Sequence, residues 1–94
     1  MGIGMALLEQ GILDGRTGRW VTDSFADYRV CTSADVGAIE VEFVDEPDPC
    51  LPPLGARGLG EIPIVGVAAA VANAVYHATG RRVRELPITV EKLL

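Results

Sequence analysis

The hydrophobic pattern at the start of the chain is helical. Met5, Leu8 and Ile12 share a helical face, which predicts a helix over residues 1–10 with Gly11 placed to act as its C-cap. The pattern begins abruptly, with no N-cap before it. We therefore interpret it as the last two turns of a helix whose beginning is missing.

Two extended segments are predicted after this helix. Residues 11–21 read as a hairpin, because Asp14-Gly15 and Thr17-Gly18 offer the positive φ angles that a tight turn needs. Residues 39–44 alternate as Ile-Glu-Val-Glu-Phe-Val, which predicts a strand with one buried and one wet face. The four prolines in residues 45–53 then predict an extended, rigid connection.

A second helix is predicted over residues 64–78. Pro63 suits its first turn, and Gly80 stands where a left-handed C-cap residue belongs. The sequence between them is mostly Ala, Val and Gly, so the helix is apolar nearly all round and is expected to be buried. The predicted fold class is α+β, with short strands in a hairpin, a buried small-residue helix and a capped terminal turn over residues 89–94.

Composition limits the size of the domain and its partners. The 94 residues form one domain at most, yet 49% of them are hydrophobic, so part of the apolar surface is expected to pack against a partner. The net charge of −5 argues against nucleic acid, and Arg81, Arg82 and Arg84 are instead expected to complement the dipole of the second helix. No apolar segment reaches about 18 residues without interruption, so neither a signal peptide nor a membrane span is predicted.

No metal site is predicted from the side chains. Cys31 and Cys50 have no metal-ligand spacing and are expected to be reduced thiols. His77 is the only histidine, and near a helix C-terminus it is expected to be structural.

The candidate for chemistry is Glu61, at the mouth of the second helix. Gly55, Gly58 and Gly60 precede it, and glycine at that density indicates positive φ angles or the close approach of a ligand. A reachable carboxylate on such a turn can act as a general base. The alternative is a structural role, in which Glu61 caps the helix or complements its dipole. The glycines match neither GxGxxG nor a P-loop, and Glu61 would repel phosphate.

Three stretches carry a family resemblance, namely Leu54 to Ile62, Ala68 to Val75 and Leu86 to Thr89. In order and spacing they resemble the C-terminal end of the molybdenum-binding subunit of the xanthine dehydrogenase/aldehyde oxidase family. The linker at residues 45–49 and residues 76–84 are most similar to the bacterial three-subunit aldehyde oxidoreductases. The similarity covers residues 1–94 and implies a single segment, the C-terminal part of a molybdopterin-binding domain that is several times longer.

The resemblance also implies roles for single residues. Glu61 matches the family's catalytic glutamate, which takes a proton from a molybdenum-bound hydroxyl while an aldehyde or N-heterocycle is oxidised with water-derived oxygen. Gly58 and Gly60 would let the turn lie against the molybdenum–pterin cofactor. Arg57 stands where Lys is more often expected, which keeps the charge and changes the hydrogen-bond geometry.

Partners and rival interpretations follow from the same resemblance. The implied partners are the remainder of the molybdenum subunit, iron–sulfur and FAD-carrying domains or subunits, and a small-molecule substrate; a homo-oligomer is compatible. The expected compartment is the cytoplasm, or the periplasm if the assembly is exported with a partner. Alone, the chain is not expected to bind the cofactor or turn over substrate. One rival is a truncated, non-catalytic structural or interaction module with the same fold. The other is an unrelated small domain in which Glu61 caps a helix.

Overall fold

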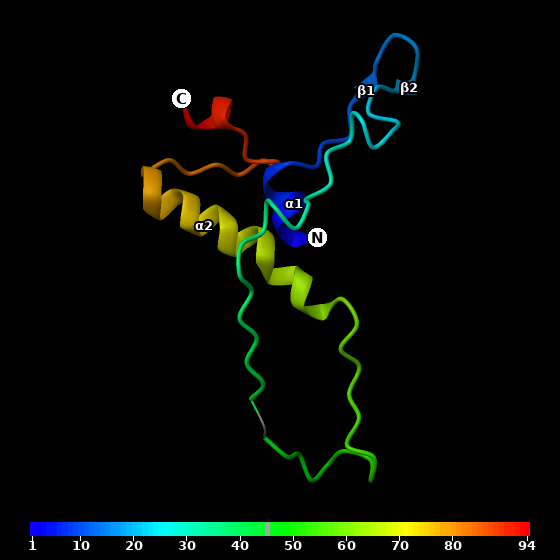
Figure 1. The fold of residues 1–94 in the computed structure, drawn as a ribbon, viewed down its shortest axis with the longest axis vertical. Coiled ribbons are helices and arrows are strands. Elements are labelled where there is room, and N and C mark those ends of the chain that lie inside the picture. The colour runs from blue at the N-terminus through cyan, green and yellow to red at the C-terminus, as the bar shows by residue number, and fades with distance from the viewer. Residues whose placement is uncertain (45) are drawn as a thin grey trace.

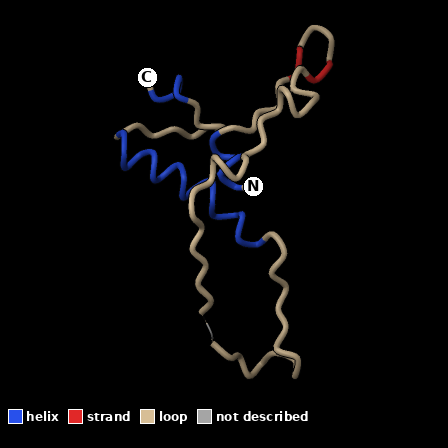
Figure 2. The backbone as a smooth tube through the Cα atoms, viewed as in Figure 1, coloured by secondary structure: helices blue, strands red, loops and turns tan. Residues whose placement is uncertain are grey.

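The computed structural model describes residues 1–44 and 46–94. In chain order its elements are helix α1 (Gly2–Leu7), strands β1 (Leu13–Asp14) and β2 (Arg19–Trp20), the 3₁₀ helix η1 (Ile62–Gly66), helix α2 (Val67–Thr79) and the 3₁₀ helix η2 (Val90–Leu93). Figure 1 shows α1 beside α2 near the middle, with the hairpin and the long loop before η1 projecting in different directions. Figure 2 shows how much of the backbone lies in loops between these elements.

Packing is centred on α1, whose small residues let other segments come close. Ala6 is fully buried, and Gly2 and Gly4 are buried with it. A Cβ atom built on Gly2 would lie 2.5 Å from the Cβ atom of Val67, so a glycine is needed where α1 meets α2. From the other end of the chain, the buried Ile88 donates its N–H to the Ala6 carbonyl at 2.7 Å. Helix α1 is therefore where the two ends of the chain meet.

Helix α1 is shorter than predicted. Leu8 is its C-cap, and the amides of Leu8 and Glu9 both donate to the Gly4 carbonyl at 2.8 Å. The prediction that Gly11 is the C-cap is wrong. Gly11 instead lies against the Trp20 ring, whose nearest carbon would be 3.1 Å from a Cβ atom built there. The shared carbonyl tightens the last turn and directs the chain toward the hairpin.

The predicted hairpin is confirmed. Strands β1 and β2 form a two-stranded antiparallel sheet, in which Leu13 is paired with Trp20 and Asp14 with Arg19. The connecting turn has one positive angle, at Gly18 (φ 69°), whereas the other glycine of the turn has none. Of the two glycines in the predicted turn, Gly15 and Gly18, only Gly18 therefore needs the conformational freedom of a glycine.

The Asp14 carboxylate organises this turn. Its Oδ1 accepts the backbone N–H of Arg16 at 2.9 Å, and its Oδ2 accepts the Thr17 hydroxyl at 2.7 Å. The bond from Thr17, followed by the bond from Arg16, lowers the pKa of Asp14 because both stabilise the ionised form.

Residues 39–44 do not form the predicted strand. They run as irregular chain, and Ile39, Val41 and Phe43 are 73%, 68% and 85% exposed. A strand needs a neighbour for its backbone hydrogen bonds, and the only sheet in the described part of the chain is the hairpin. The alternating pattern therefore marks a face that another segment could cover, and no such segment is present among residues 1–44 and 46–94.

The predicted second helix is confirmed in position. η1 and α2 are contiguous, and Gly80 is the left-handed C-cap (φ 73°), donating its N–H to the Tyr76 carbonyl at 2.8 Å. The expectation that this helix is buried is wrong within the chain, because no residue of α2 is buried. Helix α1 covers only part of its surface.

The same segment corrects the prediction about membrane spans. Ile62–Thr79 is an 18-residue run with a mean hydropathy of 1.4, none of it buried, which is long and apolar enough to cross a membrane. The core helix of a larger soluble protein has the same length and composition. These two properties therefore do not distinguish the two surroundings, and the absence of a membrane partner stays a prediction.

The predicted terminal turn coincides with η2, although Thr89 makes no side-chain capping bond to it. The pKa of Glu91 is lowered, first by its own backbone N–H and then by the Thr89 side chain, because both favour the ionised carboxylate. Lys92 donates its ammonium to the Pro87 carbonyl at 2.9 Å. Side-chain bonds of this kind hold the end of the chain near residues 87–89.

The chain covers little of its own apolar surface. Its radius of gyration is 18.0 Å, whereas a compact protein of this length has about 12 Å. The buried apolar side chains among the described residues are Ala6, Pro87 and Ile88, while Phe25, Val44 and Leu54 are at least 85% exposed. Such exposure is typical of a surface that packs against further protein.

Replacing Gly2 by Ala should weaken the packing of α1 on α2. The new methyl group would lie 2.5, 2.6 and 2.9 Å from three side-chain carbons of Val67, so the helices must move apart. We expect a loss of about 1–3 kcal/mol in the free energy of unfolding, measured in urea by circular dichroism. Gly37→Ala is the control, since its Cβ would meet no atom within 4 Å. Equal losses in both variants would contradict this account.

A hydrogen bond joins the loop after the hairpin to α1. The Tyr28 hydroxyl donates to the Glu9 carboxylate at 2.9 Å. This bond, then partial burial and the charge of Glu9, raise the pKa of Tyr28 above its usual value. The protonated phenol is therefore the form that stabilises this contact.

The stability that Tyr28 contributes should be complete below pH about 10 and should be lost as the pH rises through its higher folded pKa. Phenolate absorbance, compared between the native chain and Tyr28→Phe, isolates its titration. Glu9→Gln should move that titration to lower pH by removing the carboxylate acceptor, whereas Glu40→Gln should not. A titration that is the same in both variants would show that Glu9 does not control Tyr28.

Candidate functional site

Glu61 lies exposed at the start of η1. It occupies the N-cap position (φ −100°, ψ 13°), and its side chain makes no capping hydrogen bond. Its carbonyl accepts the N–H of Ile64 at 3.1 Å, and the Leu59 carbonyl accepts the N–H of Ile62 at 3.0 Å. The backbone of Glu61 is therefore fixed by the beginning of the helix, while its carboxylate is not used to cap it.

The glycines before Glu61 leave the backbone open. Gly55 and Gly60 have positive φ angles of 64° and 39°, as predicted for part of this run, whereas Gly58 does not. A Cβ atom built on any of the three would meet no atom of the chain within 4 Å. A ligand or another protein segment could therefore approach this backbone without meeting a side chain.

A shallow, open hollow of about 300 Å³ adjoins Glu61, between the start of α1 and the start of η1. Met1 and Gly2 line it on one side, and Gly60 and Pro63 line it on the other. Glu61 is the one acidic side chain in this lining. The packing of α1 on α2 therefore places a largely apolar wall beside the carboxylate.

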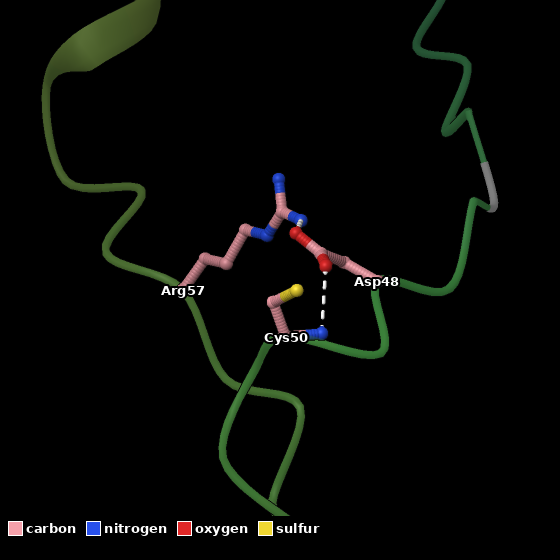
Figure 3. Close-up of polar contacts among 3 residues, drawn as sticks. All are labelled: Asp48, Cys50 and Arg57. Carbon is pink, nitrogen blue, oxygen red and sulfur yellow. Dashed lines mark hydrogen bonds and ion pairs between the residues drawn. The ribbon is translucent and has the colours of Figure 1, made fainter.

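An ion pair closes the loop that leads to Gly58. Nη2 of Arg57 lies 2.6 Å from Oδ2 of Asp48, and Oδ1 of Asp48 accepts the backbone N–H of Cys50 at 2.9 Å (Figure 3). Both oxygens of the carboxylate are therefore engaged. The pair joins residues nine positions apart, directly before the glycine turn.

The loop between these partners turns back twice. Leu51 donates its N–H to the Asp48 carbonyl at 3.1 Å, and Gly55 donates its N–H to the Pro52 carbonyl at 2.7 Å. The prediction of a fully extended connection over residues 45–53 is therefore wrong for residues 48–53, and Asp45 lies outside the described residues. Sequence reasoning missed the pairing of Asp48 with Arg57. Opposite charges on either side of a proline-rich segment are the signal that could have suggested it.

The basic cluster lies at the opposite end of α2 from Glu61. Arg82 donates Nη1 to the Asn73 side-chain oxygen at 2.7 Å, and its guanidinium lies 3.9 Å from the centroid of the Tyr76 ring. His77 is exposed and forms an edge-to-face pair with Tyr76. Contacts with Asn73 and Tyr76 therefore hold Arg82 against the side of the helix, in addition to the dipole interaction that the sequence predicted.

Metal-ligating side chains do not cluster in the described part of the chain. No group of three or more His, Cys, Asp or Glu side chains there could hold a metal ion. Cys31 is half-buried and Cys50 exposed, and both are free thiols. Of the predicted site residues, the structure brings Gly58, Gly60 and Glu61 together in one turn, without metal ligands beside them.

Comparisons with known proteins identify relatives of the whole segment, although no family model matches it. The chain is 50% identical over all 94 residues to the molybdenum-binding subunit of an aldehyde oxidoreductase from Escherichia coli. It is 41% identical over 93 residues to a putative xanthine dehydrogenase molybdenum-binding subunit of the same organism. It is 36% identical over 96 aligned residues to the large subunit of nicotine 6-hydroxylase from Paenarthrobacter nicotinovorans. Between 99% and 100% of the chain is covered, but only 12–13% of each relative.

These identities establish homology with one class of protein, the molybdenum-binding subunits of molybdenum-containing oxidoreductases. The chain belongs, as a segment, to the xanthine dehydrogenase/aldehyde oxidase family, and it shares more identity with the aldehyde oxidoreductase subunit than with the xanthine dehydrogenase subunit. An unrelated small domain is therefore excluded. The segment spans about 13% of the length of the first relative, which agrees with its large exposed apolar surface.

Glu61→Gln should leave the stability of the fold unchanged. Because Glu61 makes no capping bond, we expect the free energy of unfolding to change by less than about 0.5 kcal/mol, whereas losing a working N-cap costs about 0.5–2 kcal/mol. Urea unfolding measures the difference. Asp14→Ala, which removes two turn-forming hydrogen bonds, is the positive control. A loss in Glu61→Gln as large as in this control would favour the capping role.

Proposed function

We propose that this segment contributes the general base, Glu61, to the active site of a molybdenum hydroxylase. The observation that carries the proposal is an exposed, non-capping carboxylate on an open glycine turn, in a chain homologous over its full length to molybdenum-binding subunits. The names of the relatives refer to aldehyde, xanthine and nicotine oxidation. The proposed substrate is accordingly an aldehyde or an N-heterocycle, oxidised with oxygen derived from water.

The residues present fit a molybdenum–pterin cofactor that other parts of the subunit hold. Gly58 and Gly60 offer bare backbone facing open space, against which a flat group could lie closely. The described residues include no cluster of metal-ligating side chains, so the pterin or other parts of the subunit would have to retain the metal. When bound, the cofactor supplies the oxygen that is transferred and accepts two electrons from the substrate.

Glu61 has the properties of a general base. Such a group must reach the proton that it takes and must be held in place. The hydrogen bond from the Ile64 N–H and the start of η1 hold its backbone, and the positive end of the helix dipole favours a negative charge there. The apolar lining beside Glu61 would help to exclude water once other segments cover it.

The proposed partners are the remainder of the molybdenum-binding subunit together with iron–sulfur and flavin domains or subunits, which would carry the electrons away. Relatives named as molybdenum-binding and large subunits belong to multi-subunit enzymes, which supports this assignment. Within the subunit, the segment would form the C-terminal part of the molybdopterin-binding domain, an α+β fold. The assembly is proposed to be cytoplasmic, or periplasmic if it is exported with a partner.

A non-catalytic structural or interaction module is the second candidate. It is favoured by the small core, since Ala6, Pro87 and Ile88 are the buried apolar side chains in the described part of the chain. In such a module, the glycine turn would serve as a contact surface and Glu61 would have no role in turnover. The two candidates therefore differ in the importance of one carboxylate.

Glu61→Gln in the complete enzyme complex should abolish most turnover. Gln has nearly the same shape but cannot accept the proton, so we expect kcat to fall about 10²- to 10⁴-fold, the range that general bases contribute. Steady-state kinetics and molybdenum content are measured on the same preparation. Glu40→Gln changes an exposed acid that does not line the hollow beside Glu61, and it should keep normal turnover. Normal turnover in Glu61→Gln with a full complement of molybdenum would favour the non-catalytic module.

A further inference from the structure

The Gly58–Glu61 turn is tied firmly to the helix that follows it. The N–H of Ile62 donates to the Leu59 carbonyl at 3.0 Å. On the other side, the turn begins directly after Arg57, whose guanidinium is bound to Asp48 at 2.6 Å. We propose that Asp48 and Arg57 are positioning residues for Glu61, and that their ion pair, the clasp, fixes the end from which the turn leaves the loop. This inference rests on the proposed role of Glu61.

The Asp48 carboxylate is oriented by a second hydrogen bond, independent of Arg57. Its Oδ1 accepts the N–H of Cys50 at 2.9 Å, in a turn of the same kind as the one that Asp14 forms in the hairpin. This bond fixes the carboxylate plane and leaves Oδ2 for the guanidinium (Figure 3). The clasp therefore has a defined geometry on its acidic side.

The prolines between the partners restrict the loop. Pro49, Pro52 and Pro53 fix three φ angles, so fewer chain conformations are lost when Asp48 and Arg57 come together. The side chains of Asp48 and Arg57 are 38% and 59% exposed, and an exposed ion pair contributes little to global stability. The expected effect of the clasp is therefore on the position of the chain, with little change in unfolding.

Three residues separate Arg57 from Glu61, and two of them are glycines. Because glycine is conformationally permissive, the backbone of residues 58–60 would be loosely held if it were fixed only at the end that enters η1. A reacting group displaced by about 1 Å can lose about 100-fold in rate. Asp48 and Arg57 would therefore act on turnover through the chain, without touching the substrate.

The test uses the complete molybdenum-binding subunit in its enzyme complex. Asp48→Asn and Arg57→Gln should each lower kcat about 3- to 30-fold, with KM within about twofold and molybdenum content unchanged. The double variant should be no worse than the poorer single variant, because both changes remove one interaction. Arg57→Lys keeps the charge but loses the planar guanidinium group, so its kcat should lie between those of the native enzyme and Arg57→Gln. If Asp48→Asn does not assemble, Arg57→Lys replaces it in the test.

Asp14→Asn is the matched control. It removes a charge from a carboxylate that forms the same kind of turn with the Arg16 N–H, but no ion pair to Asp14 is present among residues 1–44 and 46–94. We expect its kcat to equal that of the native enzyme. Hydrogen exchange in residues 49–57 should quicken in Asp48→Asn and Arg57→Gln and stay unchanged in Asp14→Asn.

Three results would contradict the proposed positioning role of the clasp. These are unchanged kcat and exchange in both single variants, losses that multiply in the double variant, or a loss of molybdenum that accounts for the lower rate. Glu61→Gln separates this failure from failure of the proposed function. If Glu61→Gln is inactive while the clasp variants match the native enzyme, only the positioning role is lost. If Glu61→Gln is fully active, the proposed function itself is wrong.

Discussion

The close contact between Gly2 of α1 and Val67 of α2 is the constraint on which the rest of the structure depends. No larger residue fits at Gly2 without separating the helices, and the same short helix receives the hydrogen bond from Ile88 near the other end of the chain. Segments distant in sequence are thus held around six residues. Because η1 and α2 are contiguous, this contact also places the start of α1 beside Glu61.

Beyond that contact, local carboxylate bonds order the loops. Asp14 and Asp48 each accept a backbone N–H two residues ahead, and Asp35 accepts both the N–H and the hydroxyl of Thr32, at 2.8 and 2.7 Å. The bonds from Thr32 lower the pKa of Asp35. Several acidic residues are therefore used as turn formers, which a segment with few internal apolar contacts needs. The hairpin and the loop that leads into η1 project away from the packed helices (Figure 1).

The elements that could be predicted from the sequence are those with local causes. The hairpin follows from the turn residues near Gly18, and the end of α2 follows from the positive φ angle at Gly80. Burial of α2 and the strand over residues 39–44 could not be predicted correctly, because both need a neighbouring segment and none among the described residues covers α2 fully or pairs with residues 39–44. At the site, glycine spacing located the open turn, but the Asp48–Arg57 pair depends on the path of a loop that no local pattern specifies.

The start of η1 explains why the Glu61 carboxylate is available for chemistry. The first N–H groups of a helix normally need acceptors, which capping side chains provide. Here the N–H of Ile62 is bonded to the Leu59 carbonyl, Pro63 has no N–H, and the N–H of Ile64 is bonded to the Glu61 carbonyl. The first N–H groups of the helix are thus satisfied by backbone carbonyls, or are absent at Pro63, without a capping side chain. An acid at this position is not needed to begin the helix, which favours a role for its side chain outside the chain itself.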